Sequence, residues 1–298
     1  MARTTILDGG MGQELLARTR SRPTPLWSAR VMIDHPEIVC EVHDDYFRAG
    51  AEIATTNTYS VLHDRLIPAG LDHRFRELHA LACQMAVSAR DAHGSGLVAG
   101  SLGPIGWSYL PELAPPWNVA AEIYEEIVRL HDPIVDLFLI ETMSSIDQAR
   151  GALAATAISG KPTWLAVTAD DDDGSRLRSG EAVTGILELV EEFSPEALLV
   201  NCSKPEATTT AIGELAPNLE STRLGAYANG FAGIADAFKT TQGTVDQLDV
   251  RTDLGPQRYA DFAAEWIGLG AEIVGGCCEI GPSHIRVLAE RFGRPERC

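Results

Sequence analysis

Long hydrophobic runs are missing from this chain of 298 residues. No apolar run approaches the ~20 residues that a membrane-spanning helix needs, so we expect no contact with a membrane. Residues 1–5 lead directly into an apolar strand and lack the hydrophobic core of a signal peptide. These two absences predict a cytoplasmic protein.

Positive charge and cysteine are also scarce. Lys and Arg number 24 against 42 Asp and Glu, which gives a formal charge of −18. A chain of this charge repels phosphate backbones, so nucleic acid is a poor candidate partner. The six cysteines are few for the length, and in a reducing compartment they favour metal binding or catalysis over disulfides. None of these features predicts the oligomeric state.

Eight short β-rich runs recur along the chain, and each is followed by a stretch with helical periodicity. The expected strands cover residues 5–7, 52–56, 97–100, 137–140, 163–167, 197–200, 224–227 and 272–274. The expected helices cover residues 36–49, 75–92, 119–130, 146–158, 183–193, 206–215, 259–269 and 283–292. Such alternation implies parallel strands with right-handed crossovers. Eight units favour a single α/β domain over residues 1–298, a (β/α)8 TIM barrel, with an open doubly wound sheet as the alternative.

Small polar or reactive residues follow nearly every expected strand at its C-terminal end. Asp8-Gly9-Gly10 follows the first strand, Glu141 the fourth and Asn201-Cys202 the sixth. Active sites of barrel enzymes lie at this face and draw residues from several strands. The pattern therefore predicts a catalytic mouth rather than a purely structural barrel.

Three cysteines lie at the ends of two expected strands, Cys202 after the sixth and Cys277 and Cys278 after the eighth. These strands flank the seventh, so their ends can converge across the barrel mouth. Three thiolates with one open position are typical of a catalytic zinc site, and thiolates disfavour Mg²⁺ and Ca²⁺. Gly275-Gly276 would let the backbone turn so that both following sulfurs reach one ion. Buried core cysteines are the alternative interpretation.

A zinc site of this kind favours one type of reaction. A substrate thiol that became the fourth ligand would lose its proton and stay nucleophilic, because metal coordination lowers its pKa. Three thiolates make zinc a weaker Lewis acid for water, so alkyl transfer to sulfur is favoured over hydrolysis. A zinc hydrolase and a purely structural zinc barrel are the alternatives.

Other motifs receive a structural interpretation. Cys40, Cys83 and Cys298 lie on expected helices or at the terminus and are read as structural or incidental. The four acidic residues at 170–173 are read as a solvated loop after the fifth strand. Residues 110–118, which hold three prolines, are read as a surface loop.

Eight short stretches occur in a fixed order along nearly the whole chain, at residues 7–12, 25–29, 43–51, 56–59, 100–104, 141–142, 201–202 and 275–278. Together they resemble the homocysteine S-methyltransferase family. The Gly-Gly-Cys-Cys run, combined with Asn-Cys, carries most of the specificity. The resemblance implies a (β/α)8 barrel that holds one Zn²⁺ on Cys202, Cys277 and Cys278 and methylates the thiol of L-homocysteine to give methionine.

The resemblance also implies roles for individual residues. Asp8 and Glu141 would hold the amino group of homocysteine, with Gly9 and Gly10 close to its amino-acid end. Two carboxylates at a barrel rim can fix an ammonium group, and glycine lets the backbone approach it.

The methyl donor follows from family members and chain length. The chain has no room for a folate or cobalamin domain and lacks the C-terminal extension of the betaine enzymes. A sulfonium donor is favoured, S-methylmethionine first and S-adenosylmethionine second. Trp27 and Tyr59 match aromatic positions near the family's donor site, where an onium methyl group would lie over a ring.

Two segments depart from the family pattern, residues 106–118 and 227–231. Both are expected near the mouth, so the donor and the exact acceptor are less well specified than the zinc ligands. The alternatives are another onium donor such as betaine, a related thiol or selenol acceptor, and a homocysteine-binding module that needs a separate methyl-donor partner.

Overall fold

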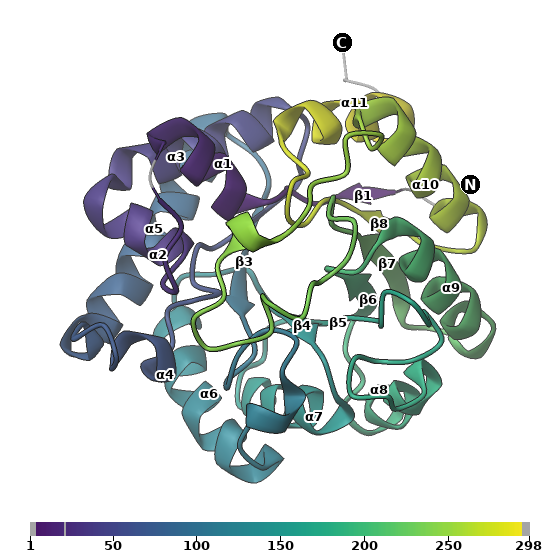
Figure 1. Cartoon of the computed structure of the whole chain (residues 1–298), viewed down its shortest axis with the longest axis horizontal. Helices are drawn as coiled ribbons and strands as arrows, with labels where there is room; N and C mark the ends of the chain where they lie inside the picture. Colours follow the sequence, from purple (N-terminus) through teal and green to yellow (C-terminus); the bar gives the residue numbers. More distant parts are fainter. Residues whose placement is uncertain (1–3, 21, 294–298) are drawn as a thin grey trace.

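Eight parallel strands close into a barrel in the computed structural model, which describes residues 4–20 and 22–293 (Figure 1). The strands are β1 (Thr5–Ile6), β2 (Ile53–Thr55), β3 (Leu97–Leu102), β4 (Leu137–Met143), β5 (Thr163–Val167), β6 (Ala197–Asn201), β7 (Arg223–Tyr227) and β8 (Ile273–Val274). Their order is β1-β8-β7-β6-β5-β4-β3-β2. A parallel bridge between Leu7 and Ile53 joins β1 to β2 and completes the ring. The predicted TIM barrel is confirmed, and the open sheet is excluded.

A ring of helices surrounds the strands (Figure 1). In the described part of the chain they are α1 (Met11–Thr19), α2 (Ser28–Asp34), α3 (Pro36–Arg48), α4 (His63–Leu66), α5 (Phe75–His93), α6 (Trp117–His131), α7 (Ile146–Thr156), α8 (Leu187–Phe193), α9 (Pro205–Leu215), α10 (Pro256–Gly268) and α11 (Pro282–Phe292). Proline stands at the first position of α3, α9, α10 and α11, where its missing N–H has no helical partner to lose. None of these helices is long and apolar enough to cross a membrane.

The hydrophobic core has two layers because side chains alternate along each strand. In β4, Leu137 and Leu139 point into the barrel, where they join residues such as Leu199. Phe138 and Ile140 belong to the larger cluster between the strands and the helices. The barrel interior is therefore a packed core that supports the mouth from below.

The predicted elements are present, with shifts at their ends. Strands β3 and β4 run two or three residues further than expected, because Ser101 continues the pairing although it is polar, and β4 resumes pairing at Met143 after an irregularity that contains Glu141. Three helices were missed, α1, α2 and α4, all in the first two β/α units. Residues 110–118 form a loop with one short 3₁₀ turn, Pro111–Leu113, before α6 begins at Trp117. Cys298 lies outside the described residues.

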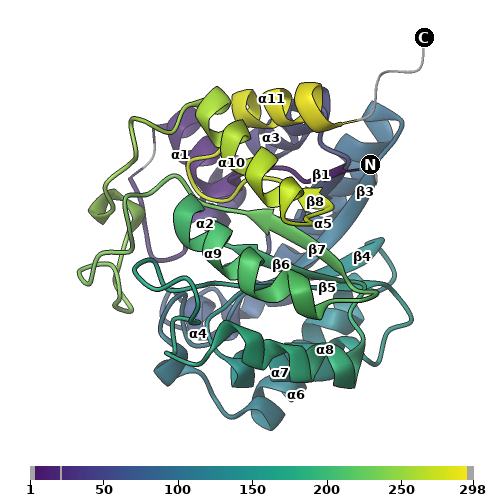
Figure 2. The ribbon, with the colours of Figure 1, turned by 90° about the vertical axis from the view of Figure 1, so that its right-hand side faces the viewer.

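One long segment, residues 231–255, crosses the barrel mouth (Figure 1). It contains a bridge between Phe231 and Val250 and a 3₁₀ turn, Val245–Gln247. Figure 2 shows it projecting from the end of the barrel opposite the chain termini. The segment therefore covers the face where the strands end.

The interior layer can be tested with Leu199→Ala. Leu199 is fully buried inside the barrel, so this change removes methyl groups from a closed space. We expect a loss of about 2–5 kcal/mol in the free energy of unfolding, measured by urea denaturation. The exposed Leu269→Ala is the matched control and is expected to change it by less than about 0.5 kcal/mol. Equal losses in the two variants would contradict this account of the core.

Candidate functional site

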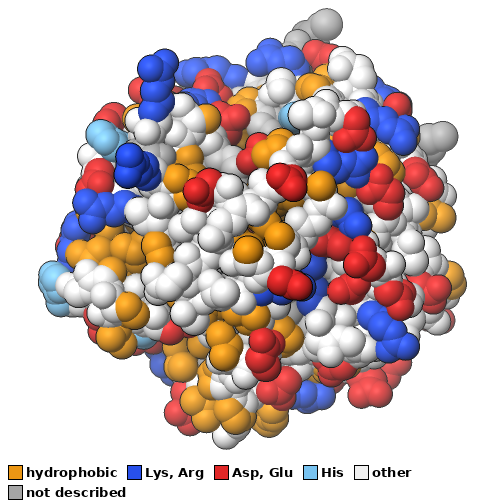
Figure 3. Space-filling view, viewed as in Figure 1, with side chains coloured by type: hydrophobic (Ala, Val, Ile, Leu, Met, Phe, Trp, Pro, Cys, Tyr) orange, Lys and Arg blue, Asp and Glu red, His pale blue; other side chains and the backbone are white. Residues whose placement is uncertain are grey.

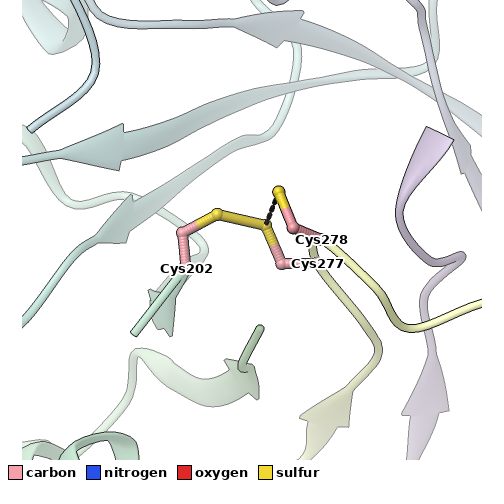
Figure 4. Close-up of side chains that lie close together, drawn as sticks. All are labelled: Cys202, Cys277 and Cys278. Carbon is pink, nitrogen blue, oxygen red and sulfur yellow. Dashed lines mark hydrogen bonds between the residues drawn. A yellow bond between two sulfur atoms is a disulfide. The ribbon is translucent and has the colours of Figure 1, made fainter. Parts of the chain in front are cut away.

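The three cysteines named by the sequence meet at the mouth of the barrel (Figure 4). Cys202 directly follows β6, and Cys277 and Cys278 lie in the turn after β8. Their three sulfur atoms lie within 4.8 Å of one another, so the group could hold a metal ion. Cys202 has a positive φ of 52°, a conformation that costs energy for a residue with a Cβ atom. The backbone strain turns this residue out of the strand direction at the site.

The same three sulfurs also permit a different bond. The structure joins Cys202 and Cys277 by a disulfide, and the Sγ of Cys278 lies 4.0 Å from the Sγ of Cys277 (Figure 4). The expectation of thiols without a disulfide is wrong for this pair. An arrangement that brings three thiolates to one ion also brings two sulfurs within bonding reach, so oxidation competes with metal binding. Burial raises the pKa of the Cys278 thiol to about 12.

Glycines allow the turns after β1 and β8 to touch. A Cβ atom on Gly10 would lie 2.5 Å from the carbonyl oxygen of Cys277, and one on Gly276 would collide with the side chain of Ile280. Neither Gly275 nor Gly276 has a positive φ. The glycine pair before the cysteines therefore provides close packing rather than a left-handed turn.

Asp8 and Glu141 face the same pocket from β1 and β4. Asp8 accepts hydrogen bonds from the backbone N–H of Thr55 at 2.7 Å and from its hydroxyl at 2.9 Å. Glu141 accepts from the hydroxyls of Ser101 and Tyr227. Burial raises the pKa of both carboxyls to about 7, and the charge of Asp8 adds to the rise at Glu141. The pair is poised to ionise fully when a cation binds between them.

Strand ends near the cysteines are fixed by side-chain hydrogen bonds. Asn201 accepts from the backbone N–H of Thr142 at 3.0 Å and donates to its hydroxyl at 2.9 Å. Asn229 donates to the carbonyl of Cys202 at 2.9 Å. The segment 227–231, which departs from the family pattern, thus supports the loop that carries the first cysteine.

The acidic run at 170–173 is not simply a solvated loop, and that interpretation is wrong for Asp171. The Asp171 carboxylate pairs with Arg178 at 3.1 Å, and both side chains are at most 10% exposed. Arg178 also donates to the carbonyl of Cys202 at 3.2 Å and lies over the ring of Tyr109. Neither Arg178 nor Tyr109 carries a local motif, and only a long-range contact reveals their part in the site.

Trp27 and Tyr59 form an aromatic wall on one side of the pocket. The rings of Trp27 and Tyr59 pack edge to face with centroids 5.8 Å apart. The hydroxyls of Tyr59 and Ser108 are hydrogen-bonded at 2.7 Å, which joins this wall to the loop at 106–109. The indole N–H of Trp27 is buried without a partner among the described residues.

All nine residues predicted for the site line one pocket, and backbone strain gathers around it. The nine are Asp8, Gly9, Gly10, Trp27, Tyr59, Glu141, Cys202, Cys277 and Cys278. Five of the eight described non-glycine residues with positive φ also line it: Trp27, Trp107, Tyr109, Thr142 and Cys202. Strain of this kind gathers at functional sites, where the surrounding structure enforces it.

The covering segment 231–255 adds Phe231, Phe238 and Leu248 to the pocket. Figure 3 shows the same face with uncharged and hydrophobic side chains over much of its centre and acidic side chains gathered on its right-hand side. The pocket combines aromatic and other apolar side chains with a few polar groups, as small-molecule sites do.

Comparisons with known proteins agree with this geometry. The profile of the homocysteine S-methyltransferase family matches residues 5–292. The chain is 30% identical to the homocysteine S-methyltransferase of Escherichia coli (strain K12), over 96% of this chain and 94% of the relative. It is 27% identical to betaine–homocysteine S-methyltransferase 1 of Rattus norvegicus, over 97% of this chain and 72% of the relative. The crystal structure of the Escherichia coli homocysteine methyltransferase MmuM in its metallated form superposes with a TM-score of 0.81 at 28% identity, covering 97% of this chain and 96% of that one.

The raised pKa values predict how stability depends on pH. Asp8 and Glu141 have pKa values of about 7 in the fold against ordinary values of 3.8 and 4.5. The folded chain therefore binds more protons than the unfolded chain between about pH 4 and 7. Their stabilising contribution is complete below pH 4 and is lost as pH rises through 7, at up to about 1.4 kcal/mol per pH unit for each group.

Asp8→Asn and Glu141→Gln should each flatten this decline, as measured by urea denaturation of the ligand-free protein at pH 5, 6, 7 and 8. The exposed Glu220→Gln is the control and should follow the wild-type curve. If both pocket variants kept the wild-type slope, the two carboxyls would not titrate near neutrality.

Proposed function

The chain belongs to the homocysteine S-methyltransferase family, and we propose on this basis that it transfers a methyl group from a sulfonium compound to the thiol of L-homocysteine, giving methionine. The donor we favour is S-methylmethionine, with S-adenosylmethionine second. One observation carries the proposal: three cysteine sulfurs and two carboxyl groups share a single pocket at the barrel mouth. The first set suits a substrate thiol, and the second suits an amino-acid ammonium group.

The three cysteine sulfurs fit zinc. Three sulfurs within 4.8 Å of one another match the thiolate-rich shell that Zn²⁺ accepts, and they face an open pocket where a fourth ligand has room. Zinc bound to Cys202, Cys277 and Cys278 would supply one thing, a lowered pKa for the homocysteine thiol. The disulfide between Cys202 and Cys277 must be reduced before all three can serve as ligands.

Asp8 and Glu141 suit the acceptor's ammonium group. Burial holds protons on these carboxyls near neutral pH, and an ammonium group placed between them would favour their ionised forms. Gly9 and Gly10 line the pocket beside Asp8, so their backbone can face the amino-acid end of homocysteine. Fixing this end orients the sulfur toward the three cysteines, and orientation is a large part of catalysis for such a transfer.

The aromatic wall suits the donor. An onium methyl group carries positive charge and is attracted to the faces of Trp27 and Tyr59. A general base in the pocket is not required, because the thiol would release its proton to solvent before the methyl group moves. The methyl group then moves in line from the donor sulfur to the homocysteine sulfur, and the donor leaves as a neutral thioether.

Removal of one ligand tests the metal site. Cys202→Ala, purified with a reductant, should fall from about one zinc per chain to well below half, and methyl transfer should fall at least about 100-fold. Zinc is measured by atomic absorption and transfer by methionine formation. Cys40→Ser, on the outer helix α3, is the control and should keep both values. Full activity in a zinc-free Cys202→Ala protein would exclude the metal-based proposal.

A donor panel tests the reaction itself. The zinc-loaded protein is given homocysteine with S-methylmethionine, S-adenosylmethionine, betaine or dimethylsulfoniopropionate, and methionine is quantified. We expect S-methylmethionine to give a kcat/KM at least about tenfold above the others. Betaine as the best donor would reassign the donor class, and turnover only after addition of cell extract would indicate a binding module that depends on a partner.

A further inference from the structure

Arg65 is a buried cation in the wall of the pocket. It lies in the short helix α4, is 5% exposed and lines the same pocket as the cysteines. Its guanidinium group packs 4.8 Å from the ring centroid of Trp107 and 5.6 Å from that of Tyr59. The cation therefore lies against the aromatic wall, on the ring of Tyr59.

Among the described residues, the guanidinium of Arg65 has no hydrogen-bond partner. Its Nε and Nη2 atoms are buried without a hydrogen bond, and it forms no ion pair with any described residue. The carboxylate of the adjacent Asp64 accepts instead from the backbone N–H of Gly106 at 2.7 Å. Aromatic faces stabilise a cation but do not satisfy its N–H donors, so this burial is costly in the ligand-free protein.

A second buried arginine of the site has the polar partners that Arg65 lacks. Arg178 also lies over an aromatic ring, but it pairs with Asp171 and donates to Thr168 and Cys202. That arginine has every partner that a structural role requires. Arg65 also packs on aromatic rings but has none of these partners. An anion that enters the pocket could supply them.

We propose, building on the proposed function, that Arg65 binds the carboxylate of the methyl donor. A guanidinium group presents parallel N–H donors that match a carboxylate, and the buried setting makes such a contact strong. The same tyrosine, Tyr59, lines the pocket and contacts Arg65. A donor whose onium methyl group contacts the ring of Tyr59 and whose carboxylate binds Arg65 would be held at both ends.

The proposal separates the two substrates by charge. The acceptor's ammonium group binds Asp8 and Glu141 near the sulfurs. The donor's carboxylate binds Arg65 beside Tyr59. The structure thus assigns the donor to onium compounds that also carry a carboxylate. Simple onium ions that lack a carboxylate are excluded as good donors.

Steady-state kinetics of Arg65→Met test this assignment. The change keeps the length of the side chain and removes the charge. We expect the KM for S-methylmethionine to rise about 10- to 100-fold, while the KM for homocysteine stays within about twofold. Arg65→Lys keeps the positive charge but lacks the parallel N–H donors of a guanidinium group, so its KM for S-methylmethionine should be intermediate. Arg150→Met is the matched control, because Arg150 also lies over a tryptophan, Trp117, but outside the pocket, and should leave both KM values unchanged.

Thermal melting gives a second readout that does not need turnover. Ligand-free Arg65→Met should melt at the wild-type temperature or above, because it loses a buried cation without a partner. S-methylmethionine should raise the melting temperature of the wild type and not that of Arg65→Met, while homocysteine with zinc should raise both. If the wild type binds S-methylmethionine but transfers no methyl group, the proposed function fails and this inference stands.

Three results would overturn the inference. They are a rise in the KM for homocysteine equal to that for the donor, a melting temperature several degrees lower in ligand-free Arg65→Met, and a wild-type melting temperature that S-methylmethionine does not change.

Discussion

The pocket depends on the close approach of two turns, one after β1 and one after β8. The backbone N–H of Gly10 donates to the carbonyl of Ile280 at 2.9 Å, and that of Gly276 donates to the carbonyl of Asp8 at 2.9 Å. Side chains on Gly9, Gly10 or Gly276 would push these turns apart. The same contact joins two strands of the barrel and places a carboxylate beside two cysteines. The contact that closes the barrel therefore also assembles the site. This explains the four glycines of the two turns, Gly9, Gly10, Gly275 and Gly276.

Local charge in the pocket matters more than the net charge of the chain. The sum of −18 says little about the site, because most acidic side chains are solvated. Inside the pocket, two carboxyls are held partly protonated by burial, and one guanidinium group is buried without a counter-ion. Each is unfavourable in the empty fold and becomes favourable when an opposite charge arrives. The ammonium group of an amino-acid acceptor and the carboxylate of an onium donor would supply these charges.

The sequence was sufficient for the barrel and for the half of the site built on strand ends. Strand periodicity predicts each β/α unit, and the residue just after a strand must face the mouth, so Asp8, Glu141 and Cys202 could be named in advance. It was not sufficient for Arg65 and Arg178, because a single arginine in a loop or short helix carries no periodic signal. Their importance lies in which partners they have or lack, and only tertiary contacts reveal this. The disulfide was missed for a similar reason, since spacing in the chain does not reveal that two sulfurs lie within bonding distance.

The division between strand ends and loops also has a functional meaning. Groups proposed for the acceptor stand in β4 or just after β1, β6 and β8, strands whose positions are fixed by the packed barrel. Groups proposed for the donor stand on the loops that hold Trp27 and Tyr59 and on the short helix α4 that holds Arg65. Loops on a rigid scaffold tolerate change far better than strands do. A barrel of this kind can therefore keep one acceptor while its donor changes, and the segments where this chain departs from its family, 106–118 and 227–231, lie around the donor wall and the first cysteine.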